Sequence, residues 1–272
     1  MTDPAAIARA ILADCAGTFQ SVLGDRLIAA YALGSVAHGG YAPAVSDLDL
    51  ALVLADTVDD DVVQSTWNTL RESHRKLSVF WSSLAGLRAG TADGRFPALD
   101  RLDLAEHGSL LLGTDVRAEV ARPGADELLV DSARFAVGLL GTDAILAEFR
   151  QPATLLTDTV IFSKAILFPV RFLYSAALTS AAVGSNNAAI DWYLARPDPV
   201  GASLVRLAVA VRNGAPLDPA QAEPALLAEL TPLYLAYLDD QIPRLRAVAA
   251  PAELVAAFSS WREKLTNAHA PE

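Results

Sequence analysis

Apolar residues in the first part of the chain recur with two spacings, one typical of helices and the other of buried strands. Residues 4–22 have apolar side chains every three or four positions, so they predict a helix, with Thr2 or Asp3 as its cap. The stretch 59–76 has the same spacing and predicts a second helix. Short apolar runs predict strands at 26–33, 47–55 and 77–82. The pattern therefore indicates a small unit in which helices and strands alternate.

The second half of the chain has only helical patterns. Before it, the glycine-bearing segment 86–97 predicts a loop, and 99–112 predicts a helix with a short extension. Proline, glycine and charged residues then accumulate at 113–126. Further helices are predicted at 126–150, 154–182, 186–195, 199–213, 219–249 and 251–268. We therefore predict an α+β chain, with a small N-terminal domain (1–118) of mixed sheet and flanking helices and a C-terminal all-α helical bundle (119–272).

The segment 31–50 carries the chemistry, because it joins an apolar strand, a Gly-Ser turn, a loop and two aspartates. Asp47 and Asp49 are two positions apart in the predicted strand, so their side chains should leave the same face. Neighbouring carboxylates repel each other unless a cation lies between them, and Mg²⁺ prefers oxygen ligands that include phosphate oxygens. Asp47 and Asp49 are therefore the predicted metal ligands and catalytic residues.

The Gly-Ser turn that precedes these acids has the features of a phosphate-binding loop. Gly34 has no side chain, so the backbone can approach a phosphate closely, and Ser35 and the amides after it can donate hydrogen bonds. Ser46 can donate in the same way beside the metal. Gly34, Ser35 and Ser46 are thus predicted to bind the phosphates of a Mg²⁺-bound nucleoside triphosphate.

This segment resembles the signature of the DNA polymerase β nucleotidyltransferase superfamily, in which a loop separates Gly-Ser from Asp-X-Asp. Within that superfamily the chain is similar to the aminoglycoside nucleotidyltransferases, and to the streptomycin/spectinomycin adenylyltransferases in particular. Residues 171–175 (RFLYS) and 188–192 (AAIDW) look like that group's helix pair, in which the arginine reaches the nucleotide phosphates. Residues 106–113 resemble the group's hinge region.

The resemblance implies a nucleotidyltransferase domain followed by the helical bundle, with Arg171 on the triphosphate. The lysine that the group has before its second helix is replaced here by Asn186 or Asn187. Lys164, two helical turns before Arg171, is the predicted substitute for that positive charge. His38, beside the phosphate loop, is a further candidate for contact with the nucleotide, with a loop histidine of no special role as the alternative.

One expected acid is missing. The adenylyltransferases have a glutamate on the strand after the first crossover helix, which takes a proton from the acceptor hydroxyl. Here Ser78 occupies the aligned position, and a neutral serine is not a useful base at neutral pH without a partner. Acids on neighbouring segments are possible replacements, and nothing in the sequence selects one: Glu72, Asp93, Asp100, Asp103 and Glu106.

Three functional hypotheses follow. The first is a Mg²⁺-dependent nucleotidyltransferase that moves AMP from ATP to a hydroxyl of a small, cationic acceptor such as an aminoglycoside. The second is a degenerate, nucleotide-binding but non-catalytic sensor or interaction protein, motivated by Ser78. The third is a nucleotidyltransferase that acts on a protein or RNA, as in toxin–antitoxin relatives.

The composition limits the kinds of molecule that this chain is expected to bind. The 272 residues carry a net charge of −11, which argues against binding to a nucleic-acid backbone. One cysteine and no Cys/His cluster argue against disulfides and a zinc site. The apolar stretch 160–184 is interrupted by Lys164, Pro169 and Arg171, which argues against a membrane span. We expect a cytoplasmic protein, with no membrane or nucleic-acid partner, that binds a nucleoside triphosphate and a small-molecule acceptor; no pattern indicates an oligomeric state.

Overall fold

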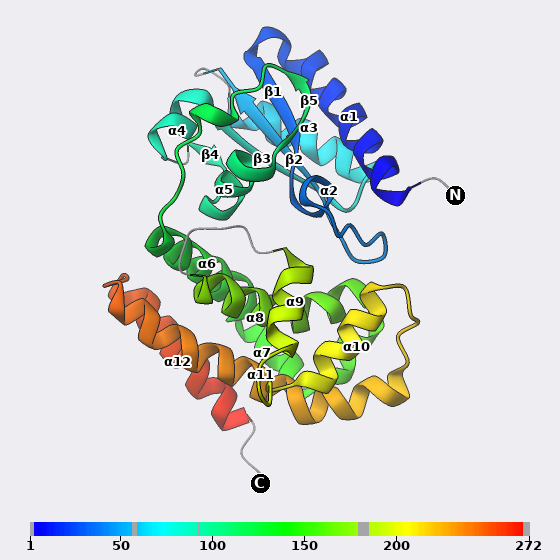
Figure 1. Cartoon of the computed structure of the whole chain (residues 1–272), viewed down its shortest axis with the longest axis vertical. Coiled ribbons are helices and arrows are strands. Elements are labelled where there is room, and N and C mark those ends of the chain that lie inside the picture. The colour runs from blue at the N-terminus through cyan, green and yellow to red at the C-terminus, as the bar shows by residue number, and fades with distance from the viewer. Residues whose placement is uncertain (1–2, 56–58, 92, 179–184, 269–272) are drawn as a thin grey trace. The chain divides into compact units, whose positions relative to one another are not determined.

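The chain forms two compact units, which divide between Gly124 and Ala125 (Figure 1). The structure is a computed structural model. It describes residues 3–55, 59–91, 93–178 and 185–268. The predicted domain boundary, between residues 118 and 119, falls within the first unit, inside the short 3-10 turn Arg117–Glu119.

The first unit alternates helices and strands, as the hydrophobic pattern predicts. Asp3 caps the first helix, because its side chain accepts a hydrogen bond from the Ala5 N–H at 3.0 Å, whereas Thr2 lies outside the described residues. The elements are α1 (Pro4–Leu23), a 3-10 turn (Gly24–Arg26), β1 (Leu27–Ala32), α2 (Gly34–His38), β2 (Leu48–Leu54), α3 (Asp60–Ser73), β3 (Leu77–Ser83), α4 (Leu84–Ala89), β4 (Gly94–Arg95), α5 (Ala98–His107) and β5 (Ser109–Gly113).

The strands form one mixed sheet in the order β4-β3-β2-β1-β5. β2 and β3 are parallel and are joined through α3, whereas the other neighbouring strands are antiparallel. Alternate residues of β2 point to opposite faces. Leu50 and Leu52 belong to the cluster that includes side chains of α1, and Ala51 and Val53 to the one that includes side chains of α4 and α5. Asp49 therefore points to the same face as α4 and α5.

Three local predictions need correction. The predicted strand 47–55 begins at Leu48, so Asp47 precedes β2 rather than lying in it. The predicted loop 86–97 contains the end of α4 and all of β4, and the end of the predicted helix 99–112 is the strand β5. β5 pairs with β1 and β4 pairs with β3. Because these partners are distant in sequence, local periodicity alone does not reveal the strands.

The second unit is helical in its described residues, as predicted. Its core contains aromatic side chains that contact one another, such as Tyr237, Phe258 and Trp261. The predicted helix 126–150 is divided, because Thr142 caps a new helix through the Ile145 N–H. The elements are α6 (Ala125–Leu140), α7 (Asp143–Arg150), a 3-10 segment (Pro152–Thr157), α8 (Thr159–Ala177), α9 (Asn186–Leu194), α10 (Ala202–Arg212), α11 (Pro219–Ala247) and α12 (Ala252–Ala268).

Two segments, Pro4–Arg26 and Thr159–Ala177, are long and apolar enough to cross a membrane by length and composition alone. Each also contributes fully buried side chains to a hydrophobic core, such as Phe19 in the first unit and Phe162 in the second. Core helices of soluble proteins have the same length and composition, so the finding by itself is weak evidence for a membrane span.

Tyr31 generates a prediction about stability. Its hydroxyl, fully buried in β1, accepts a hydrogen bond from the Val116 N–H at 2.7 Å and donates one to Asp115 at 3.2 Å. Burial, the largest cause, raises the pKa of Tyr31 to about 12, so the phenol stays neutral at neutral pH. Tyr31→Phe leaves the Val116 N–H without this acceptor and should lower the free energy of unfolding by about 1–3 kcal/mol in urea denaturation.

Tyr41→Phe is the matched control, because the Tyr41 hydroxyl makes no hydrogen bond to any described residue. It should change the free energy of unfolding by less than about 0.5 kcal/mol. Equal losses in the two variants would contradict the assignment of this hydrogen-bonding role to Tyr31.

Candidate functional site

The structure brings Gly34 and Asp49 into direct proximity. β1 and β2 are antiparallel neighbours, and the Leu33 N–H just after β1 donates a hydrogen bond to the Asp49 carbonyl at 2.9 Å. Gly34 has a φ of +60°, which favours glycine, and a Cβ added there would lie 2.3 Å from Asp49 Oδ2. The chain therefore needs a glycine at position 34 for two reasons: its backbone conformation and the space taken by the Asp49 carboxylate.

Asp47 lies on the loop between α2 and β2, which is closed by its own contacts. Ser46 is 7% exposed, and its hydroxyl accepts a hydrogen bond from the Ala42 N–H at 3.0 Å. Lys76 Nζ donates to the Pro43 carbonyl at 2.8 Å. The first role of Ser46 is thus to close the loop, although its hydroxyl proton can still be donated. Asp47 itself is half-buried.

Ser78 is the direct neighbour of Asp49 across the parallel strands β2 and β3. The position aligned with the missing glutamate therefore lies beside the predicted metal ligand. Among the described residues, no group of three or more His, Cys, Asp or Glu side chains is arranged to hold a metal ion. The donor set still suits Mg²⁺, because proteins commonly bind this ion through one or two carboxylates, with water and substrate phosphates completing its shell.

Asp103, one of the five replacement acids, contacts the turn directly. It lies on α5, is 5% exposed and accepts a hydrogen bond from the Gly34 N–H at 2.6 Å. Asp49 and Asp103 thus both lie against Gly34. No sequence pattern indicates this contact, since the two residues are far apart in the chain.

Other acids of that set have different surroundings. Asp93 accepts a hydrogen bond from the Ser83 N–H at 3.0 Å, and hydrogen bonds from nearby serines lower the pKa of its carboxyl although burial opposes them. Glu106 pairs with Arg122 at 3.1 Å. Glu72 is exposed on α3. Asp93 and Glu106 thus have partners of their own, Ser83 and Arg122.

Arg95 is a residue that the sequence analysis missed. Its guanidinium lies 4.6 Å from the centre of the Trp67 ring and 4.9 Å from that of Phe80. Burial lowers the pKa of Arg95, and the negative charges of Asp100 and Asp49 oppose this shift. A positively charged group held between two aromatic rings therefore acts on Asp49 electrostatically. In the sequence it is simply an arginine within the predicted loop 86–97.

Lys164 and Arg171 both lie on α8, half-buried, in the second unit. Arg212 on the neighbouring helix α10 is 6% exposed. Its pKa is lowered first by burial and then by the positive charge of Arg171. The second unit thus holds two arginines close enough to interact, of which the sequence analysis identified one. The contact of Lys164 and Arg171 with a nucleotide stays a prediction.

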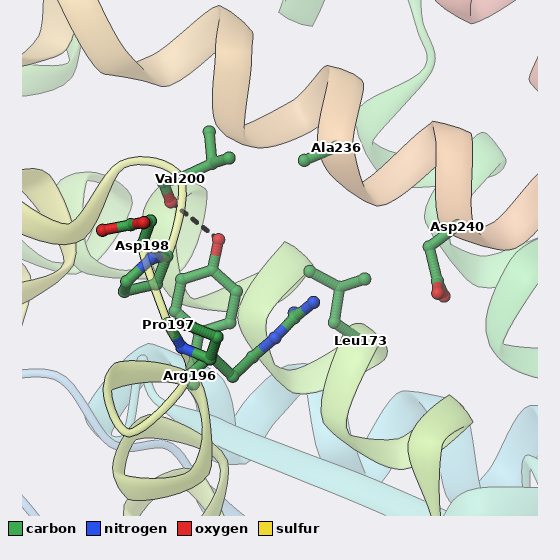
Figure 2. Close-up of a pocket in the computed structure, with 9 residues that line it drawn as sticks. Leu173, Arg196, Pro197, Asp198, Val200, Ala236 and Asp240 are labelled. Atoms are coloured by element: carbon green, nitrogen blue, oxygen red, sulfur yellow. Dashed lines mark hydrogen bonds between the residues drawn. The ribbon is translucent and has the colours of Figure 1, made fainter.

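A cavity of about 100 Å³ lies elsewhere in the second unit (Figure 2). Arg196 extends into it between Pro197 and Leu173, and its guanidinium lies 5.0 Å from the centre of the Trp192 ring. The Tyr193 hydroxyl closes one wall by donating to the Val200 carbonyl at 2.7 Å. Neither Lys164 nor Arg171 lines this cavity, so it is separate from the predicted nucleotide residues.

The mixed sheet with flanking helices, followed by a helical unit, is the fold class that we predicted, and a solved adenyltransferase shares it. The chain matches the crystal structure of spectinomycin adenyltransferase AAD(9) from Enterococcus faecialis with ATP and spectinomycin. The TM-score is 0.55 at 10% sequence identity, and the match covers 93% of this chain and 98% of that one. No protein-family model and no curated protein sequence matches the chain. At this identity the likeness shows the fold.

The contact between Gly34 and Asp49 is testable by a double-mutant cycle. Gly90 is the control, because it has a similar positive φ (+71°) in the left-handed region, and a Cβ there would make an ordinary contact at 3.5 Å. Gly34→Ala and Gly90→Ala should both carry the strain of a positive φ, about 1–2 kcal/mol. Gly34→Ala should lower the free energy of unfolding by about a further 0.5–1.5 kcal/mol, because its methyl group forces the Asp49 carboxylate out of its rotamer.

Adding Asp49→Ala to Gly34→Ala should recover most of that further loss, since the overlapping atoms are then gone. Chemical denaturation of the single and double variants measures the coupling. Purely additive losses would show that Asp49 does not lie against this turn.

Proposed function

We propose that this chain is a Mg²⁺-dependent nucleotidyltransferase that transfers AMP from ATP to a hydroxyl of a small, cationic acceptor such as an aminoglycoside. The proposal rests chiefly on the Asp49 carboxylate lying against the Gly34 turn. The shared fold supports it, because AAD(9) was solved with ATP and spectinomycin. The net charge of −11 is suited to a cationic acceptor.

Asp47 and Asp49 would hold the Mg²⁺, and Gly34 and Ser35 would lie along the triphosphate. When bound, the ion neutralises phosphate charge and stabilises the oxygens at which negative charge develops. Gly34 allows the backbone to come close to a phosphate oxygen, and the Ser35 hydroxyl can donate to it. Arg171 and Lys164, on α8, stay the predicted source of positive charge for a triphosphate.

In the transfer, the acceptor oxygen forms a bond to the α-phosphorus as the bond from that phosphorus to the bridging oxygen breaks. Pyrophosphate leaves with the electron pair of the broken bond. The acceptor hydroxyl loses its proton, and β3 has no carboxylate to take it. We assign the proton to water, the base that remains when this strand offers none.

The enzyme hypothesis predicts Mg²⁺-dependent release of pyrophosphate from ATP with at least one member of a panel of aminoglycosides and aminocyclitols. Asp47→Asn and Asp49→Asn should each lower the rate about a thousandfold, because each removes a charged ligand of the ion. Glu72→Gln, at an exposed acid on α3, is the control and should keep the wild-type rate. A wild-type rate no higher than that of Asp49→Asn with every acceptor would rule out the activity.

A second function, nucleotide binding without transfer, is favoured by one observation: Ser78 lies beside Asp49 where the related enzymes have their base. Under this alternative the wild type binds Mg²⁺·ATP in calorimetry but releases no pyrophosphate with any acceptor. Both functions therefore predict binding of Mg²⁺·ATP, and they differ in whether pyrophosphate is released.

Ser78→Glu tests this position directly. A carboxylate next to Asp49 should raise the rate of transfer about a hundredfold, because general-base catalysis typically contributes that much. Ser65→Glu, on the exposed surface of α3, adds the same charge away from Asp49 and should leave the rate unchanged. If neither variant alters the rate while the wild type is active, position 78 is not where the acceptor proton is taken.

A further inference from the structure

Asp103 is a buried acid with an unusual partner. Its side chain belongs to α5, is 5% exposed and accepts the Gly34 N–H at 2.6 Å. Removing a carboxylate from water is unfavourable unless hydrogen bonds replace its hydration. A backbone amide that donates to a charged acceptor makes one of the stronger bonds of this kind. The contact therefore joins α5 firmly to the turn after β1.

α5 also contacts the other end of α2. His107 lies one helical turn after Asp103, so both side chains lie on the same side of α5. The His107 ring meets the His38 ring edge to face, with 5.7 Å between the ring centres. Gly34 and His38 are the first and last residues of α2. One side of α5 thus contacts both ends of this short helix.

α5 is itself anchored. Arg101 is 4% exposed and donates hydrogen bonds to the Gly90 carbonyl at 2.8 Å and to the Ala121 carbonyl at 3.0 Å. Leu104 is fully buried in the same cluster as Leu33, the residue before the turn. Asp103 therefore reaches Gly34 from a helix that is fixed by contacts on its other sides.

We propose that Asp103 is a positioning residue of the nucleotide site, which holds the Gly34–Ser35 turn in the conformation that lets Asp49 lie against it. The consequence for nucleotide binding rests on the proposed function. Asp103 acts on the turn directly, because its carboxylate accepts the Gly34 N–H. Since Asp103 occupies the Gly34 amide, the Ser35 hydroxyl is left to meet phosphate.

The first test needs no nucleotide. In NMR spectra of the full chain, the Gly34 amide proton should resonate far downfield, exchange slowly with water and show a scalar coupling from its nitrogen to the Asp103 carboxyl carbon. Asp103→Ala should abolish the downfield shift and the protection. Asp103→Asn keeps an oxygen acceptor of similar size and should retain part of both. Glu72→Ala, which removes one negative charge from an exposed site of the same unit, should alter neither.

The second test measures Mg²⁺·ATP binding by calorimetry. Asp103→Ala should raise the dissociation constant at least about tenfold, because the turn loses the hydrogen bond that fixes its conformation. The dissociation constant of Asp103→Asn should lie between those of Asp103→Ala and the wild type. In an active enzyme, the KM for ATP should rise more than kcat falls, since Asp103 does not touch the reacting atoms. Glu72→Ala should bind like the wild type.

These measurements distinguish the positioning role of Asp103 from the proposed function of the chain. An unperturbed Gly34 amide in Asp103→Ala, or no coupling in the wild type, overturns the positioning role even if every variant binds nucleotide. A perturbed amide with unchanged binding overturns its role in nucleotide binding. If the wild type binds no Mg²⁺·ATP, the proposed function fails, and the positioning role is then decided by the Gly34 amide alone. The wild-type coupling keeps the test decisive if Asp103→Ala does not fold.

Discussion

The candidate site depends on one close approach, between the backbone of Gly34 and the carboxylate of Asp49. The antiparallel pairing of β1 and β2 brings the end of one strand beside the start of the other. The positive φ of Gly34 then turns the chain back so tightly that a side chain would overlap Asp49 Oδ2. An acid and the glycine turn become neighbours in this way. Phosphate and a divalent cation need such a combination if they are to bind together.

The charged groups around the Gly34–Asp49 contact come from three different elements. Asp49 is on β2, Asp103 reaches the Gly34 amide from α5, and Arg95 acts on Asp49 from β4. Ser78, the neighbour on β3, is neutral. The arrangement thus keeps the parts that would hold a metal-bound triphosphate, and it lacks a carboxylate where the acceptor would lose its proton. Under the proposed function, metal binding and charge neutralisation then supply the catalysis, and water takes the proton.

Most elements could be predicted from the sequence, because each has a local cause. Apolar spacing of the helical type marks α1 and α3, and unbroken apolar runs mark β1, β2 and β3. The predicted fold class is confirmed by the structural match. The errors are at places where no local cause exists. β5 is a strand only because β1 lies beside it, and Asp47 is outside β2 because pairing with β3 begins at Leu48.

The sequence by itself determined the strand, the glycine turn and the two aspartates, because these features lie within one short segment and follow from backbone and side-chain chemistry. It also determined that β3 has no acid. Only the tertiary structure decided that Asp103, of the five acids, contacts the turn. It also decided that Arg95 lies near enough to Asp49, and Arg212 near enough to Arg171, for their charges to interact. The physical reason is distance along the chain. A contact such as that between Gly34 and Asp103 depends on how α5 crosses the sheet, and packing sets that crossing.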